Sequence, residues 1–347
     1  MASTPRELVY RCLEFQNPQR MPRDMWLLPW AEWHYPQEVA DLRSRYPSDI
    51  VEMPNVYAPS SRTQGDQYRV GSYVDEWGCV FTSIQDGVIG EVRSPILPEL
   101  KEWRTIRPPY ELLPKGEAAK AAIDQVNRFC DQTDKFVLAA MCARPWERYQ
   151  FLRGSENTYL DIMTPDSGVS DLLALIHSFY LQEMEFWLKT KVDGFRFMDD
   201  WGSQNQLLIP PRIWREIFRP MYKDYCDLAK AYGKKAFMHS DGHIQEIYPD
   251  LIEIGVDAIN SQLFCMDLAY LEKHARGRIT FWGEIDRQHV LPSPNPEKGR
   301  EAVRLVASHL YDPNGGTIVQ FELGAGANPA VALAIFEEWE QWQIEHS

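Results

Sequence analysis

Residues 234–243 read KKAFMHSDGH, a short apolar run that ends abruptly in polar side chains. Its length and its bounding turn residues are typical of a buried strand. The run closes on His239, Ser240 and Asp241, and Gly242 then permits a sharp turn. In an extended chain, residues i and i+2 point to the same face, so His239 and Asp241 can converge on one point. The stretch therefore predicts a strand with a functional site at its carboxyl end.

Similar apolar runs recur along the chain, and helical patterns separate the later ones. The expected strands are 23–29, 49–54, 136–142, 194–200, 235–241, 257–262, 278–284 and 316–322. The segments 169–191 and 210–233 have apolar residues at helical spacing, and the second opens on prolines and ends at a glycine. Eight strands alternating with helices predict an α/β protein, a (β/α)8 TIM barrel made by residues 1–347 as a single domain. A doubly wound open sheet is the alternative, but no expected strand is followed by G-x-G-x-x-G.

One irregular segment, residues 56–115, interrupts the alternation. It contains an expected hairpin at 68–84 and a proline-rich stretch at 93–114. Segments this long between strands are more often functional than idle, so we interpret it as an insertion or lid on the barrel. Trp30 and Trp77 lie in loop or lid positions, where aromatic rings often line pockets, and both are candidate substrate contacts.

The composition limits the classes of function. Lys and Arg total 36 against 50 Asp and Glu, a net charge of −14, which argues against binding to nucleic acid or to an anionic membrane. The six cysteines are scattered without a C-x-x-C pair, which predicts reduced thiols. The chain shows no signal-peptide core and no apolar run of membrane-spanning length, so a cytoplasmic protein is expected.

The ends of the expected strands carry the candidate chemistry, because barrels of this kind hold their active sites there. His239 and Asp241 make a candidate half of a metal site, and Glu322 on the last strand is the candidate third ligand. The other polar residues at strand ends are the candidate acids Asp199, Asp200 and Glu284 and the candidate substrate contact Gln262.

The metal ligands also have a structural reading. Asp241 can cap the helix expected to begin near Ile244, with His239 packed against it. Glu322 can pair with a surface cation. A single His-x-Asp pair does not decide between these readings.

The candidate acids have structural readings as well. Asp199 and Asp200 are adjacent, so they point to opposite faces of a strand, and spacing does not say which one enters the pocket. Glu284 can form an ion pair with Arg287 or with Arg278.

Longer stretches of the chain are similar to a known family. Residues 193–225, 233–260 and 282–292, together with 73–81 and 146–162, resemble the uroporphyrinogen decarboxylase superfamily. The resemblance runs from about residue 5 to the carboxyl terminus. It implies a single (β/α)8 barrel, in agreement with the alternation of elements.

The resemblance separates two branches of this superfamily. True uroporphyrinogen decarboxylases carry an arginine-rich R-Q-A-G-R-Y stretch after the first strand. The corresponding residues 25–39 read MWLLPWAEWHYPQEV, and no arginine lies between Arg23 and Arg43. A substrate with eight carboxylates needs such cations, so the resemblance points to the other branch, the corrinoid-dependent methyltransferases.

Many members of that branch bind zinc through His-x-Cys on this strand and a second cysteine on the last strand. His239 matches the histidine, Asp241 stands at the first cysteine, and Glu322 falls at or next to the second. Such a His/Asp/Glu set is harder than a thiolate set and leaves a metal better able to polarise an ether oxygen.

The resemblance therefore implies a zinc-assisted methyltransferase. It would move a methyl group from a methoxylated small molecule to the cobalamin of a separate corrinoid protein, since the chain has no D-x-H-x-x-G motif of its own. Decarboxylation of a uroporphyrinogen-like substrate and a non-catalytic barrel that binds a partner are the alternatives. Whether the chain forms a homodimer is left open.

Overall fold

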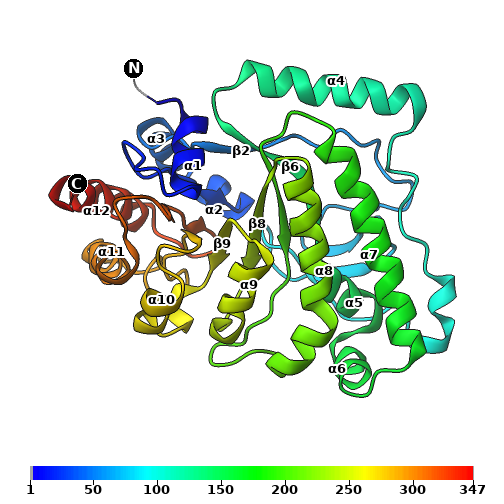
Figure 1. Cartoon of the computed structure of the whole chain (residues 1–347). Helices are drawn as coiled ribbons and strands as arrows, with labels where there is room; N and C mark the ends of the chain where they lie inside the picture. Colours follow the sequence, from blue (N-terminus) through cyan, green and yellow to red (C-terminus); the bar gives the residue numbers. More distant parts are fainter. Residues whose placement is uncertain (1–2, 347) are drawn as a thin grey trace.

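The computed structural model describes residues 3–346 and confirms the eight predicted strands (Figure 1). The last strand is split into two short pieces. In chain order the strands are β1 (Trp26–Leu27), β2 (Ile50–Glu52), β6 (Phe136–Ala143), β7 (Gly194–Met198), β8 (Lys235–Ser240), β9 (Ala258–Ser261), β10 (Thr280–Trp282), β11 (Thr317–Ile318) and β12 (Glu322–Leu323).

The strands are parallel and follow the order of a TIM barrel. The order across the main sheet is β2-β6-β7-β8-β9-β10-β11, and β12 continues the last strand to pair with β1. In the register of β8 with its neighbours, His239 lies opposite Met198 on β7 and Asn260 on β9. The carboxyl ends of these three strands therefore lie side by side, as a barrel active site requires.

Strands β1 and β2 border a seam in the barrel wall and are joined at their starting points. No ladder joins these two strands in residues 3–346. Their starting points are held together because the Asp49 backbone N–H donates to the Arg23 carbonyl at 2.8 Å. The Asp49 carboxylate accepts from the Arg23 backbone N–H at 2.8 Å and from Arg20 at 2.6 and 2.7 Å.

Helices surround the strands, and Figure 1 shows α7 and α8 side by side on one flank of the barrel. They confirm the predicted helices at 169–191 and 210–233. None of the helices in the described part of the chain is long and apolar enough to cross a lipid bilayer. The helices are α1 (Pro5–Leu13), α2 (Pro29–His34), α3 (Pro36–Arg45), α4 (Gly116–Gln132), α5 (Pro145–Arg153), α6 (Ser155–Met163), α7 (Ser167–Leu188), α8 (Pro211–Ala231), α9 (Tyr248–Ile254), α10 (Leu268–His274), α11 (Glu297–Leu310) and α12 (Pro329–His346).

The segment 56–115 carries the predicted hairpin. Strands β3 (Gly71–Val74) and β4 (Val80–Ser83) are antiparallel, and β5 (Glu91–Val92) extends them into a small sheet. A buried ion pair between Asp75 and Arg148 joins this sheet to α5. Trp77 packs edge-on against Phe179 of α7. The insertion is therefore attached to the barrel by buried contacts.

Candidate active site

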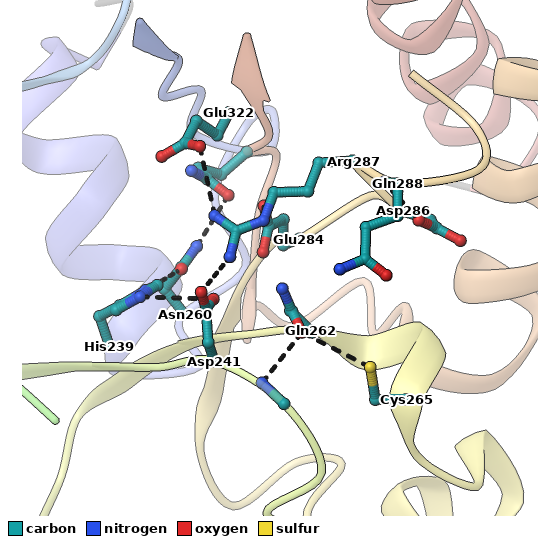
Figure 2. Close-up of polar contacts among 12 residues, drawn as sticks. His239, Asp241, Asn260, Gln262, Cys265, Glu284, Asp286, Arg287, Gln288 and Glu322 are labelled. Atoms are coloured by element: carbon teal, nitrogen blue, oxygen red, sulfur yellow. Dashed lines mark hydrogen bonds and ion pairs between the residues drawn. The ribbon is translucent and has the colours of Figure 1, made fainter. Parts of the chain in front are cut away.

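An arginine gathers three carboxylates at the mouth of the barrel. Arg287 follows β10, and its Nη2 donates to Asp241 Oδ2. Its Nη1 lies 3.2 Å from Glu322 Oε1, and its Nε lies 3.6 Å from Glu284 Oε1. Figure 2 shows the guanidinium among these three groups, which come from the ends of β8, β10 and β12. The Glu284–Arg287 pairing is one of the two structural readings weighed for that glutamate.

The sequence-predicted metal ligands divide into two groups in the structure. His239 and Asp241 lie together, whereas Glu322 is engaged by Arg287. Among residues 3–346, the cluster whose ligand atoms all lie within 4.8 Å of one another is Asp200, His239 and Asp241. The structure thus places Asp200 where the sequence analysis expected Glu322.

The orientation of the His239 ring is set by a buried hydrogen-bond chain. Asn260 Nδ2 donates to the Trp282 carbonyl at 2.6 Å and to Gln320 Oε1 at 2.7 Å. The amide oxygen of Asn260 therefore faces His239 Nδ1, 2.6 Å away, and accepts the proton of that nitrogen. A neutral His239 consequently presents its lone pair on Nε2, the state that a metal-ligating histidine adopts.

The two aspartates lie close to the exposed nitrogen of that ring. Asp200 Oδ1 and Asp241 Oδ1 are each 3.5 Å from His239 Nε2. Asp200 also accepts from the Asp241 backbone N–H at 2.9 Å, while the buried Asp241 Oδ1 has no hydrogen-bond partner within residues 3–346. One imidazole and two carboxylates with an unpartnered oxygen fit a divalent cation such as zinc, which takes three N/O ligands in catalytic sites.

Asp199, a candidate acid, has a structural position. It is fully buried and accepts from the backbone N–H groups of Trp146 at 3.0 Å and Glu147 at 2.7 Å, which lie in the first turn of α5. The Tyr222 hydroxyl donates to it at 2.5 Å. Both carboxylate oxygens are thereby occupied as a cap for α5. Of the adjacent aspartates, Asp200 is the one at the barrel mouth.

Glu284 is a buried acid. Its side chain is 2 % exposed, and neither carboxylate oxygen has a hydrogen-bond partner among the described residues. Burial raises the pKa of Glu284 to about 8, although Arg287 lowers it. At neutral pH, Glu284 therefore carries a proton. Gln262, a predicted substrate contact, accepts from the Gly242 backbone N–H at 3.0 Å, steadies the turn after Asp241, and lines a small cavity with Glu284 and Arg287.

Glu147 is a site residue that the sequence analysis did not select. It lies in the first turn of α5, and its buried Oε2 has no hydrogen-bond partner. Burial raises the pKa of Glu147 to about 7, Asp200 adds to the rise, and Arg144 and His239 oppose it. Glu147 therefore faces both Arg144 and the Asp200–His239 pair. Its place two residues after the proline that opens α5 was the available signal.

One of two large cavities adjoins this cluster. A cavity of about 740 Å³ follows the seam between β1 and β2 and is lined by His239, Glu322 and Trp26, among others. A second cavity of about 330 Å³ lies beneath the insertion and is lined in part by Trp77, which is only 4 % exposed. Trp30 stacks on His34 and is not among the described residues that line either cavity.

Comparison with known proteins identifies a family and several similar structures. A model of the family described as uroporphyrinogen decarboxylase (URO-D) matches residues 75–338. A solved structure described as a methyltransferase from Methanosarcina mazei is 12 % identical with a TM-score of 0.70, and the match covers 98 % of this chain and 99 % of that one. At this identity the similarity establishes the fold.

Other matches are weaker. A B12-independent methionine synthase from Shewanella sp. W3-18-1, solved with selenomethionine, is 11 % identical with a TM-score of 0.40, and the match covers 65 % of this chain and 67 % of that one. No curated protein sequence matches the chain.

Proposed function

Because the chain belongs to the uroporphyrinogen decarboxylase family, we propose that it transfers a methyl group from the oxygen of a methoxylated small molecule to the cobalt of a separate corrinoid protein. The observation that carries this proposal is the oriented His239 imidazole, whose Nε2 faces Asp200 and Asp241 at the barrel mouth. This arrangement fits activation of an oxygen leaving group. The full-length similarity to the fold of a methyltransferase is compatible with it.

Asp200, His239 and Asp241 are the residues that would hold a divalent cation, with zinc the first candidate. When bound there, the cation would supply Lewis acidity towards the ether oxygen. Asn260 keeps Nε2 of His239 directed at this position, because Nδ1 is committed to the Asn260 amide. Arg287 binds the other oxygen of Asp241 and so competes with a cation for that carboxylate.

The chemistry also needs a proton for the oxygen that leaves. Methyl transfer breaks the C–O bond, leaves both electrons of that bond on oxygen, and forms a new bond from carbon to reduced cobalt with the electron pair of the metal. Glu284 is protonated at neutral pH and buried next to Arg287, so it is the proton source that we assign to the departing alkoxide or phenoxide. Asp200 is the other acid at the mouth.

The proposal is tested by mixing the protein with a reduced corrinoid protein and a panel of methoxylated compounds, with and without added zinc. We expect methylcobalt absorbance that depends on the metal and is lost in His239→Ala. His177→Ala serves as the matched control, because His177 lies on the outer helix α7 and pairs with Asp224.

Two outcomes would favour the alternatives. Turnover of a porphyrinogen without cobalt methylation would assign the protein to decarboxylation. A protein that binds no metal, methylates no cobalt and decarboxylates no porphyrinogen would be a non-catalytic binding barrel.

A further inference from the structure

The cavity of about 330 Å³ beneath the insertion has the size and lining of a small-ligand pocket. It is walled by the insertion, by the end of β6 and by α7, so it depends on contacts between distant parts of the chain. Seven of its twenty lining residues are aromatic. The aromatic residues are Tyr57, Tyr73, Trp77, Phe81, Phe151, Phe179 and Tyr180.

Two arginines lie in this aromatic wall, and one of them already has its counter-charges. Arg148 is 6 % exposed, and its Nη1 donates to Asp75. Its Nη2 lies 3.4 Å from Glu76 Oε1, and its guanidinium lies over the Trp77 ring, 4.9 Å from the ring centroid. Arg148 is therefore a structural cation that anchors the insertion to α5.

The second arginine, Arg144, has no such partner. Its nearest carboxylate oxygen is Glu147 Oε2, 3.9 Å from Nη1, which is longer than a hydrogen bond. The Arg144 side chain makes no hydrogen bond to any residue in the described part of the chain, and it remains 29 % exposed. The three carboxyl groups that line the pocket do not balance it, because Asp75 and Glu76 pair with Arg148 and burial raises the pKa of Glu183 to about 8.

A guanidinium with free donors in an aromatic pocket matches one ligand chemistry well. A carboxylate accepts two parallel N–H bonds from such a fork, and a flat apolar body fills the aromatic space behind it. Glu147 lies between this pocket and the candidate active site, because its Oε2 is 3.9 Å from Arg144 Nη1 and its backbone N–H donates to Asp199, the neighbour of Asp200.

We propose that Arg144 binds the carboxylate of a small aromatic acid in the pocket beneath the insertion, and that the methyl donor is such an acid. The identification of this ligand with the methyl donor rests on the function proposed above. The binding site itself does not, because it stands on the pocket and on a guanidinium that has no carboxylate of the described residues within hydrogen-bond distance.

The test measures ligand binding to the full chain by calorimetry, without any corrinoid protein. The probes are 4-methoxybenzoate and its neutral analogue 4-methoxybenzyl alcohol. We expect the wild-type protein to bind the acid at least tenfold more tightly than the alcohol. Arg144→Gln should weaken binding of the acid about 10- to 100-fold and leave the alcohol unchanged. Arg104→Gln, an exposed arginine of the insertion, is the matched control and should bind as the wild type does.

Arg144→Lys controls for a folding defect, because it keeps the positive charge but loses the two parallel donors of the guanidinium. Its affinity for the acid should lie between those of wild type and Arg144→Gln. Equal affinity for acid and alcohol, or an unaltered affinity of Arg144→Gln for the acid, would overturn the proposal. Binding of the acid without cobalt methylation would refute the proposed function and leave the site intact. If Arg144→Gln methylated cobalt normally from neutral ethers, the carboxylate site would be refuted and the proposed function would stand.

Discussion

Arg287 decides the electrostatics of the barrel mouth at the scale of single residues. Its guanidinium contacts Asp241, Glu322 and the protonated Glu284, so one cation serves three carboxyl groups in a mostly buried space. Without it, these groups would repel one another or take up protons. The same arginine engages Glu322, and the cluster of possible metal ligands at His239 contains Asp200 instead.

We predict that Arg287→Gln tightens zinc binding at the Asp200–His239–Asp241 cluster. Loss of the cation removes the competitor for Asp241 and leaves more negative charge near the metal, and an increase of about tenfold, ~1.4 kcal/mol, is expected. Chelator competition measures the affinity. Arg278→Gln is the control, because Arg278 precedes β10 and donates to the His274 carbonyl. An unchanged or weaker affinity in Arg287→Gln would show that the arginine does not compete with the metal.

Glu284 gives a prediction about pH. Its pKa is raised from the ordinary 4.5 to about 8 in the folded protein, so the folded state binds more protons than the unfolded state between these values. The contribution of Glu284 to the free energy of unfolding therefore falls as the pH rises through this window and is constant above it.

We expect Glu284→Gln, which removes this titration, to match wild type near pH 5 and to be more stable by about 2–4 kcal/mol near pH 8.5. Urea denaturation at the two pH values checks this, with the exposed Glu216→Gln as control. If the difference in the free energy of unfolding between Glu284→Gln and wild type were the same at both pH values, the pKa of Glu284 in the folded protein would not be raised. Cobalt methylation should fall in the same variant, since it has lost the proton donor.

At the scale of elements, the insertion is both a wall of the ligand pocket and part of the core. Trp77 shows this double role, because it lines the 330 Å³ cavity yet is 4 % exposed and packs on Phe179. The sequence predicts Trp77 as a pocket residue. Because its ring also packs between a sheet and a helix, it must stabilise the folded protein as well.

We predict that Trp77→Ala lowers the free energy of unfolding by about 3–5 kcal/mol, since a buried indole leaves a large cavity. Turnover at temperatures well below the midpoint should fall as well. Trp33→Ala is the control, because Trp33 is 44 % exposed. A Trp77→Ala protein with wild-type stability and lost turnover would mean that the ring serves the ligand and not the core.

At the scale of the whole molecule, the barrel depends on one point of closure. Asp49 is 1 % exposed and ties the start of β2 to Arg23 and Arg20, while the strands beyond it diverge around the 740 Å³ cavity. Because no ladder joins β1 and β2 within residues 3–346, this clamp sets the width of the seam.

Asp49→Asn should lower the free energy of unfolding by about 1.5–3 kcal/mol, since it removes the charge of a buried carboxylate from its hydrogen bonds with Arg20 and the Arg23 backbone. Hydrogen exchange should then speed up in β1 and β2 first, while β8 and β9 in the middle of the sheet keep their protection. Uniform loss of protection in all strands would show that the seam is not a separate weak point. Asp227→Asn, in an exposed pair on α8, is the control.

The amino-acid sequence by itself determined the eight strands, the flanking helices, the hairpin of the insertion and the position of polar residues at strand ends. These features are local: an apolar run, a helical period or a turn residue is visible within about 20 consecutive positions. The tertiary structure alone decided which polar groups meet. Asp199 turns to cap α5 while Asp200 faces His239. Arg287 reaches Asp241 across 46 positions, and Arg148 reaches Asp75 across 73. Such pairings depend on register, burial and competition among several charges, and no spacing along the chain encodes them.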